Sequence, residues 1–532
     1  MNDVTRRGAA VNGEKGGAPA IAERLRRTGT RLRAPEAEPT PWGWLVTLTM
    51  LAVGLRPVGL NSGLWYDEIV TLHESVRAPL WQIVTAFPTN NQHTLFSVLA
   101  HLSVGVFGEH PWSLRLPAMV LGAATVPSLY LFARELNERT EALLAGFLLT
   151  VAYHHVWFSQ NARGYTALAF LTVLSSWLLL RGLRRGRTSD FIWYGIAAAL
   201  NMYTHLTMVF VVFSHGLLCA LLLGRSSPDP ARPARWQPAI GFAIAAALTL
   251  ALYAPLLAGM QQFFVEREQH PEVATPAWAA LALLRGLRVG VAGWSAGLVG
   301  SGLVLTGLWS YFKQSPLVTG LFVVPGVVTV AGTIVLHRPI LPRFLFFLAG
   351  FAVLIAVRGA LEAGRMVGRP STMLGTALSL AKGRGRASVP SRTPAASLML
   401  VAAMAAASLA ALMTNYRYPK QDFDGALRFV EERRAVNEPI VTVGATAYAY
   451  RRHYGRDFPA VESLAELQRI RAGGSRVWVL HTLDESIEAE MPDLMRVLRA
   501  DCAVARSFPG TLGQGNGDVT VCTAPPVATA TQ

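Results

Sequence analysis

The chain consists mainly of long apolar runs separated by short polar segments. Runs of about 17 to 24 residues can cross a bilayer as helices, because a helix rises about 1.5 Å per residue and the hydrocarbon core is about 30 Å thick. The pattern therefore predicts an α-helical polytopic membrane protein with about eleven transmembrane helices. The predicted spans are 42–60, 112–132, 142–158, one that ends near 181, two within 191–223, 238–260, 289–308, 317–336, 340–357 and 395–413.

One apolar run is too short to cross. Residues 93–107 reach only about 22 Å as a helix, which is less than the hydrocarbon thickness. We therefore place residues 61–111 outside the membrane, as a long first outer loop whose amphipathic helices lie on the membrane surface. A second, shorter outer loop is predicted at residues 159–165.

The distribution of charge supports this topology. Of the 532 residues only 15% are charged, and 52% are hydrophobic; soluble domains carry about 25% charged residues. The net charge of +15 is concentrated between the apolar runs, as in 181–187. Basic loops stay in the cytoplasm, so the positive charge indicates orientation and not a nucleic-acid partner. This orientation predicts a cytoplasmic N-terminus and an extracytoplasmic C-terminus.

Composition divides the chain into four parts. Residues 1–40 are a basic segment predicted to be a disordered cytoplasmic tail, and 41–413 are the transmembrane domain. Residues 414–522 have the composition of a small soluble α/β domain, with helices at 424–433 and 461–471 and strands at 439–443, 476–481 and 519–522. Residues 523–532 are predicted to be a disordered tail. Cys502 and Cys522 can pair if this domain faces an oxidising compartment.

Two adjacent acids stand out at the end of the first apolar run. Asp67 and Glu68 follow Trp65 and Tyr66, in a region where acids are rare. One interpretation is an interfacial loop with aromatic residues at the headgroups. The other is catalytic: a half-shielded Asp67 is suited to act as a general base, and Arg163 in the second outer loop can pair with a phosphate. Together they predict sugar transfer from a lipid phosphate.

Four motifs occur in a fixed order along the chain. They are Leu64-Trp65-Tyr66-Asp67-Glu68, Asn91-Gln92-His93-Thr94-Leu95, Trp112-Ser113-Leu114-Arg115-Leu116-Pro117 and Ser159-Gln160-Asn161-Ala162-Arg163-Gly164-Tyr165. Their order and spacing resemble the GT-C membrane glycosyltransferases, especially the bacterial branch similar to protein mannosyltransferases and aminoarabinose lipid A transferases. The resemblance covers residues 42–225 and is weaker over 226–413, where Arg338 and 341–344 look like the late Arg-aromatic segment of that family.

The resemblance implies an inverting transferase in the bacterial plasma membrane. Its donor would be a polyprenyl-phosphate sugar, and its acceptor would be a lipid, protein or glycan at the outer face. Membrane lipids would surround the protein. Asp67 would be the base, and Glu68 would orient the acceptor or a bound metal. The residues implied for donor and phosphate binding are Arg163, Arg115, Gln160, Tyr165, His93, Arg338 and Arg343. No cofactor or metal is expected, because Asn161 and Gln92 stand where many relatives have acids.

Other interpretations stay open for several residues. Arg115 is also suited to anchor a helix at the membrane–water interface. Tyr165 is also suited to the belt of aromatic residues found at that interface. His205 is either a functional group at membrane depth or a hydrogen-bonded core residue. For the whole chain the alternative is a transporter or flippase of lipid-linked saccharides, which predicts internal repeats and mid-membrane acids.

Overall fold

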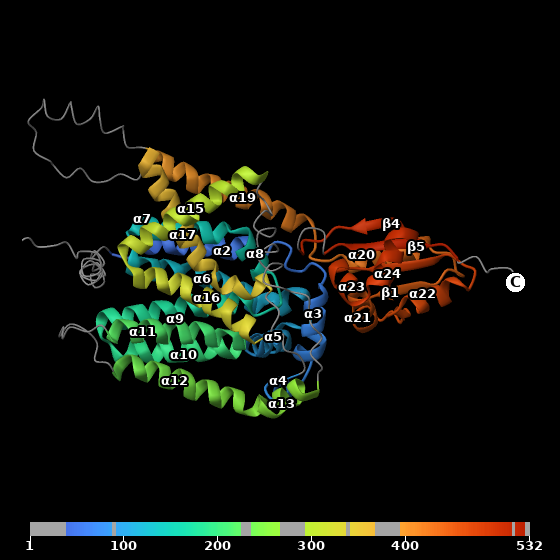
Figure 1. Ribbon diagram of the computed structural model, residues 1–532, viewed down its shortest axis with the longest axis horizontal. Helices are drawn as coiled ribbons and strands as arrows, with labels where there is room; N and C mark the ends of the chain where they lie inside the picture. Colours follow the sequence, from blue (N-terminus) through green and yellow to red (C-terminus); the bar gives the residue numbers. More distant parts are fainter. Residues whose placement is uncertain are drawn as a thin grey trace, which may run out of the picture.

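The structure is a computed structural model that describes residues 39–87, 92–224, 236–266, 293–336, 341–367, 394–512 and 517–526. Within these ranges a bundle of helices carries an α/β unit at one end (Figure 1). Residues 1–38 and 527–532 of the predicted tails lie outside the described residues, and so does Arg338. The predicted boundary of the C-terminal tail at 523 is wrong, because Thr523 and Ala524 belong to a strand of the α/β unit.

The bundle is built from helices that follow the apolar runs. They are α2 (Trp42–Leu55), α6 (Pro111–Leu136), α7 (Arg139–Val151), α8 (Tyr153–Ser159), α9 (Tyr165–Arg185), α10 (Thr188–Thr204), α11 (Val209–Gly224), α12 (Trp236–Tyr253), α13 (Leu257–Glu266), α15 (Gly293–Gln314), α16 (Pro316–Val335), α17 (Ala349–Val367) and α19 (Ala395–Arg417). The run 191–223, predicted to hold two spans, is divided into two helices, since α10 ends at Thr204 and α11 begins at Val209.

The protein is a polytopic membrane protein. Six helical segments of the described ranges are long and apolar enough to cross a membrane: Pro111–Leu136, Tyr165–Arg185, Trp236–Phe263, Pro316–Val335, Pro342–Val367 and Ala395–Arg417. A seventh is added if α7 and α8 are counted as one span. The other predicted spans correspond to helices α2, α10, α11 and α15. These helices are not among the segments that are long and apolar enough to be candidate spans. The number of eleven spans therefore stays a prediction.

The third predicted span is not one straight helix. It bends by 56° between α7 and α8, at Ala152. The Ser408 hydroxyl of α19 accepts from the Tyr153 N–H (2.6 Å) and donates to the Val151 carbonyl (3.0 Å). This side chain pairs backbone groups on both sides of the break, which allows a kink inside an apolar helix pair. Because of the bend, α8 leads directly into residues 160–164.

The first outer loop is mostly helical. It contains α3 (Tyr66–Thr71), a single π-helical turn η1 (Leu72–Val76), α4 (Leu80–Ile83) and α5 (Thr94–Phe107). Helix α5 has 14 residues and is not one of the candidate spans; α2 is left out on the same ground, so the prediction that 93–107 does not cross stays a prediction. It buries Phe96 and Ala100 and exposes Val106 and Phe107 at its end.

The C-terminal α/β unit is a five-stranded sheet with helices. Its strands are β1 (Ile440–Val443), β2 (Ala460–Val461), β3 (Val477–His481), β4 (Ala503–Phe508) and β5 (Val519–Ala524), in the spatial order β2-β1-β3-β5-β4. The β1 strand runs parallel to β2 and β3, and β5 is antiparallel to β3 and β4. The helices are α20 (Phe423–Arg433), α21 (Ala445–Arg452), α22 (Leu464–Arg471), α23 (Asp484–Glu490) and α24 (Pro492–Asp501).

Sequence and structure agree on part of this unit. The predicted helix at 424–433 is α20, and the predicted strands correspond to β1, β3 and β5. The predicted helix at 461–471 is shorter, because its first residue belongs to β2 and α22 begins at Leu464. Cys502 and Cys522 form a disulfide.

The α/β unit shares a hydrophobic cluster with the first outer loop. Leu64, Ile69 and Leu72 pack in one cluster with Phe423 and Tyr450 of the C-terminal unit. Helix α3 therefore lies between the bundle and the sheet domain, as Figure 1 shows. Since α3 carries Asp67 and Glu68, the candidate site forms where these two parts meet.

Candidate functional site

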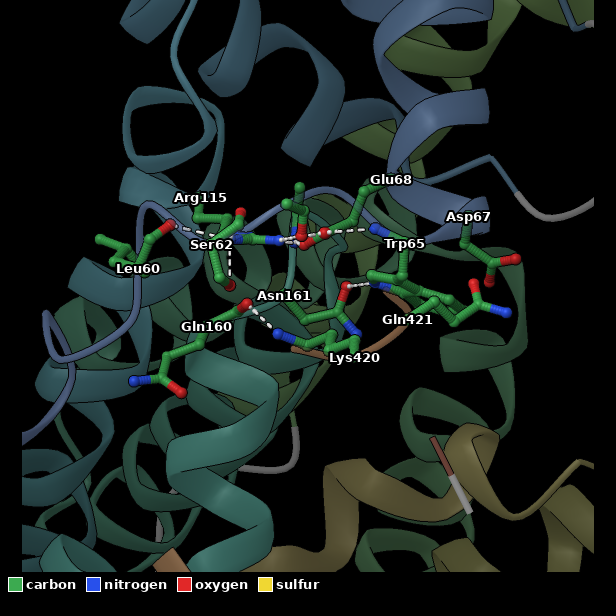
Figure 2. A network of polar contacts seen from close by, with 12 residues as sticks. Leu60, Ser62, Trp65, Asp67, Glu68, Arg115, Gln160, Asn161, Lys420 and Gln421 are labelled. Carbon is green, nitrogen blue, oxygen red and sulfur yellow. Dashed lines mark hydrogen bonds and ion pairs between the residues drawn. The ribbon is translucent and has the colours of Figure 1, made fainter. Parts of the chain in front are cut away.

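Glu68 and Arg115 form a buried ion pair that organises the site. Both side chains are fully buried, and Arg115 donates through Nε to Glu68 Oε1 (2.8 Å) and through Nη2 to Glu68 Oε2 (2.5 Å). Glu68 also accepts from the backbone N–H groups of Ala162 (2.7 Å) and Trp65 (3.3 Å). Burial alone would raise the pKa of Glu68, but Arg115, Lys420 and the Ala162 N–H lower it, so this carboxylate is ionised. Figure 2 shows the network.

The remaining N–H groups of Arg115 hold the loop that precedes α3. They donate to the carbonyls of Leu60 (2.8 Å), Ser62 (2.8 Å) and Gly63 (3.0 Å). Because α6 supplies the arginine and α3 the carboxylate, the pair fixes the loop, the helix and the 160–164 turn relative to one another. A bidentate pair of this kind is stable in a dry interior only when its other donors and acceptors are satisfied, as they are here.

Three residues with roles implied by the resemblance are bonded within the protein. Arg115 donates to Glu68 and to three carbonyls. Glu68 is fully buried and accepts from these donors and from the Ala162 N–H. Gln160 is also bonded: its Nε2 donates to the carbonyls of Arg56 and Val58, and its Oε1 accepts from Asn415. These contacts favour a structural role for all three, and their predicted roles toward donor, acceptor or metal stay predictions.

Asp67 points away from this network, although it is adjacent to Glu68 in the sequence (Figure 2). Its side chain is 14% exposed, and Arg343 Nη1 lies 3.5 Å from Asp67 Oδ2. Arg343 comes from η4 (Pro342–Leu348), the 3-10 turn that precedes α17. The structure thus places a half-buried guanidinium against the predicted base.

A pocket lies against α3 and η1. Its volume is about 280 Å³, counting the space open to solvent, and its lining residues are Val70, Thr71, Glu74, Ser75, Gln92, His93, Phe96, Ser97 and Arg163. Positions 67, 70, 71 and 74 recur at helical spacing, so Asp67 lies on the same side of this helical segment as Val70, Thr71 and Glu74, although it is not itself a lining residue. Arg163 Nη1 donates to the Thr71 hydroxyl (2.9 Å), which in turn donates to the Asp67 carbonyl (2.8 Å).

His93 and Tyr165 present buried polar atoms beside this pocket. The His93 ring is 4.9 Å from the Tyr165 ring and 5.1 Å from the His205 ring, measured between centroids. Both His93 nitrogens and the Tyr165 hydroxyl are buried without a hydrogen-bond partner among the described residues. Burial and the positive charges of Arg163 and Arg343 lower the pKa of His93 well below its usual value, so its ring is neutral at pH 7.

The charge around the pocket suits an anion next to a base. Arg163 and Arg343 are close enough to lower the pKa of His93, and Asp67 is the acid that faces Arg343. Guanidinium groups bind phosphate oxygens with two parallel N–H bonds. No group of three His, Cys, Asp or Glu side chains suited to a metal occurs within the described ranges. Independence of metal stays a prediction.

The turn between α8 and α9 is packed tightly against His93. A Cβ at Gly164 would lie 2.8 Å from His93 Nδ1 and 2.8 Å from Thr204 Cγ2, closer than side-chain atoms pack. Asn161 in the same turn accepts from the Trp65 indole N–H (3.1 Å). Asn161, which stands at a position where the predicted family often has an acid, therefore joins the two predicted outer loops through this hydrogen bond.

Comparison with known proteins shows which family part of the chain resembles. Residues 93–258 match the family of dolichyl-phosphate-mannose-protein mannosyltransferases. The chain resembles this family. The matched segment contains the predicted motifs at 112–117 and 159–165, whereas Asp67 precedes it. This match confirms the predicted resemblance to the GT-C membrane glycosyltransferases.

Individual relatives are distant. The putative mannosyltransferase YkcB of Bacillus subtilis is 23% identical over 126 residues, which are 24% of this chain and 18% of that protein. Among solved structures, ArnT of Cupriavidus metallidurans is similar with 13% identity and a TM-score of 0.49, over 90% of this chain and 98% of that one. The oligosaccharyltransferase AglB of Archaeoglobus fulgidus is similar with 13% identity and a TM-score of 0.47, over 87% of this chain and 72% of that one.

Sequence reasoning missed the contribution of the C-terminal unit to the site. Lys420 is buried, and its Nζ donates to the Gln160 carbonyl and lies 5.2 Å from the centre of the Trp157 ring. Gln421 accepts from the Tyr66 N–H (2.9 Å), and the Tyr448 hydroxyl donates to Glu74 (2.5 Å). These residues lie hundreds of positions from α3 in the sequence and follow no helical or strand period with it, so no sequence pattern indicated them.

Proposed function

We propose that the protein transfers a sugar from a polyprenyl-phosphate donor to an acceptor hydroxyl. The observation that carries this proposal is the position of Asp67, which shares a helix face with the pocket and faces Arg343 across 3.5 Å. One carboxylate beside two arginines is the minimum set for removing a proton from a nucleophile while a phosphate leaves. The family match adds a lipid-phosphate mannose as the reference donor.

The proposed reaction is a single displacement. Asp67 accepts the proton of the acceptor hydroxyl as the acceptor oxygen bonds to the anomeric carbon. The bond between that carbon and the phosphate oxygen breaks, and its electron pair leaves with the polyprenyl phosphate. Arg163 and Arg343 are placed to neutralise the charge that develops on the phosphate. Attack opposite to the leaving group inverts the anomeric carbon.

Asp67 is the base in this proposal and Glu68 is not. Glu68 is held by four N–H donors and is fully buried, whereas Asp67 is partly exposed on the pocket face. His93 and Tyr165 provide neutral hydrogen-bonding groups for a sugar or for the acceptor. The pair Asp67 and Arg343 thus performs the reaction, while Glu68 and Arg115 hold the loop from which Asp67 projects.

We place the reaction at the outer face of a bacterial plasma membrane. The positive-inside rule supports this orientation, because the strongly basic loops then lie in the cytoplasm. The disulfide between Cys502 and Cys522 also supports it, since disulfides persist mainly outside the reducing cytosol. The C-terminal unit and the pocket are then on the same, extracytoplasmic side.

A transfer assay tests the proposal. Purified full-length protein in detergent is mixed with polyprenyl-phosphate mannose, glucose or arabinose and with candidate acceptors, and release of free polyprenyl phosphate is measured. Turnover of one donor that falls about 10²- to 10⁴-fold in Asp67→Asn, with unchanged thermal stability, is expected for loss of a general base. Asp424→Asn, an exposed carboxylate of α20, is the matched control.

Two outcomes would contradict the proposal. If Asp67→Asn stays within about threefold of the parent, Asp67 is not the base. If the folded protein turns over no donor, the proposed reaction is wrong for the donors tested, and transport of lipid-linked saccharides, measured in vesicles, becomes the better hypothesis.

A further inference from the structure

Two residues of the C-terminal unit form hydrogen bonds with the helical segment α3–η1, which carries Asp67, one near each end of the segment. At its start, Gln421 Oε1 accepts from the backbone N–H of Tyr66, the first residue of α3 (2.9 Å). At its other end, the Tyr448 hydroxyl donates to Glu74 in η1 (2.5 Å), and Glu74 lines the pocket. Asp67 lies between these two attachment points.

The contact at the start of α3 is a helix cap supplied from a distant part of the chain. The first N–H groups of a helix have no partner inside the helix. Gln421 provides one while its own Nε2 donates to Thr482 (3.0 Å), and Thr482 donates to the Asp518 carbonyl (2.8 Å). Gln421 is 1% exposed, so water does not replace this bond easily. The start of α3 is therefore tied to the residue that precedes β5 through three consecutive side-chain contacts.

The contact at the other end combines a hydrogen bond with ring packing. Tyr448 belongs to α21, and its ring meets that of Tyr66 edge-on at 6.0 Å. Glu74 lies in a π-helical turn, a feature that is rare and often found at functional sites. Since this turn follows α3 without a break, moving Tyr448 moves the pocket wall and the helix together.

We propose that Gln421 and Tyr448 are positioning residues that set the placement of Asp67 relative to Arg343 and the pocket. The inference rests on the proposed function, because it assigns these residues a role in the same transfer reaction. The C-terminal unit then completes the active site through contacts that do not touch the substrate. A shift of about 1 Å in a catalytic group costs as much as 10²-fold in rate, so two bonds at the ends of a short helix are sufficient to matter.

The test uses Gln421→Leu and Tyr448→Phe in the full chain, each with a matched control. Gln468→Leu changes an exposed glutamine of α22, and Tyr450→Phe removes a hydroxyl of α21 that donates to the Phe423 carbonyl inside the unit. We expect kcat to fall about 5- to 50-fold in the two test variants with KM for the donor changed less than about twofold. The controls should stay within about twofold in both parameters.

A coupling measurement separates positioning from general destabilisation. The Tyr448→Phe and Glu74→Ala changes are combined, and the double variant should lose no more kcat than the more affected single variant, because both remove one bond. Effects that multiply would show that the Tyr448 hydroxyl acts elsewhere and would overturn its role.

Hydrogen exchange provides a readout that does not depend on catalysis. In Gln421→Leu the Tyr66 amide should exchange at least about tenfold faster, while amides of β1 and β3 stay protected. If the parent transfers sugar but both test variants keep its kcat and its exchange pattern, the inference is wrong and the proposed function stands. If the parent transfers no sugar, the proposed function fails, and unchanged exchange at residues 64–76 would refute the positioning contacts as well.

Discussion

Arg343 Nη1 lies 3.5 Å from Asp67 Oδ2, although the two residues are far apart in the sequence. Asp67 follows the first apolar helix, whereas Arg343 precedes α17. The guanidinium is 33% exposed and the carboxylate 14% exposed, so this pair is not sealed inside the bundle, although neither residue lines the pocket itself. This arrangement contrasts with Glu68 and Arg115, which are fully buried. Adjacent acids thus form one accessible pair and one structural pair.

Arg343→Ala is expected to lower kcat/KM for the donor by about 10²-fold, because it removes a cation beside the leaving phosphate. Thermal stability should change little, since a third of the side chain is exposed. The measurement is steady-state transfer with the donor varied. Arg496→Ala, an exposed arginine of α24 paired with Asp493, is the control. A loss of less than about threefold would contradict a role at the phosphate.

Glu68→Gln is expected to destabilise the protein by about 3–5 kcal/mol, because it leaves the Arg115 charge buried without its partner. Asp67→Asn should not have this effect. Thermal unfolding in detergent compares the two variants, with Glu109→Gln as the control for an exposed ion pair, which is worth less than about 1 kcal/mol. Equal stability of Glu68→Gln and the parent would show that the buried pair does not hold the loop.

The stability contributed by Lys420 is expected to rise with pH between about 7 and 10.5. Burial and the positive charge of Arg115 lower the pKa of Lys420 from 10.5 to about 7. In this pH range the unfolded chain binds a proton that the folded chain does not, so increasing pH favours the folded state. Below pH 7 the folded state must bury the charged amine, and this gain is absent.

The measurement is the melting temperature of the parent minus that of Lys420→Met between pH 6 and 10. This difference should increase with pH from about 7 to the upper end of this range, because the unfolded chain still binds the proton there. Lys313→Met, at an exposed lysine over Trp309, should give a flat difference. A flat difference for Lys420→Met would show that the amine stays protonated in the folded protein.

Reduction of the disulfide is expected to destabilise the C-terminal unit by about 3 kcal/mol, given a sequence separation of 20 residues. Dithiothreitol or Cys502→Ala with Cys522→Ala should lower the unfolding temperature of this unit. Cys219→Ala, at a buried free cysteine of α11, should leave the sensitivity to reductant in place. Unfolding that is insensitive to reductant would show that the two cysteines are not paired in the purified protein.

Gly164→Ala is expected to lower transfer at least about tenfold while the protein stays folded, since its Cβ would displace His93 and Thr204. Gly105→Ala in α5 is the matched control, because a Cβ at that position would have no neighbouring atom within 4 Å. Activity and melting temperature are measured together. Normal transfer in Gly164→Ala would mean that the position of His93 does not matter for the reaction.

The sequence by itself indicated the membrane class and the existence of a short helix near 93–107, and it predicted that the segments 61–111 and 159–165 lie on the same side. These features depend on local properties: the length of an apolar run, the charge of a loop, and the order of four motifs. The pairing of the loops is seen in the bond from Trp65 to Asn161 and in the bond from Ala162 to Glu68. The bend at Ala152 was not predicted, because it depends on Ser408 of a distant helix.

The sequence could not distinguish Asp67 from Glu68 by burial, since both are acids at consecutive positions of one helix. Successive residues of a helix point about 100° apart, so burial separates them completely once α6 and the 160–164 turn are in place. That separation leaves Glu68 and Arg115 as a fully buried pair that holds the loop, and Asp67 and Arg343 as a partly exposed pair. The contacts of Gln421 and Tyr448 with α3 likewise arise only when the C-terminal unit packs on the bundle. Apolar patterning determined that the chain enters a membrane, and long-range packing determined which of its charged groups stay accessible for chemistry.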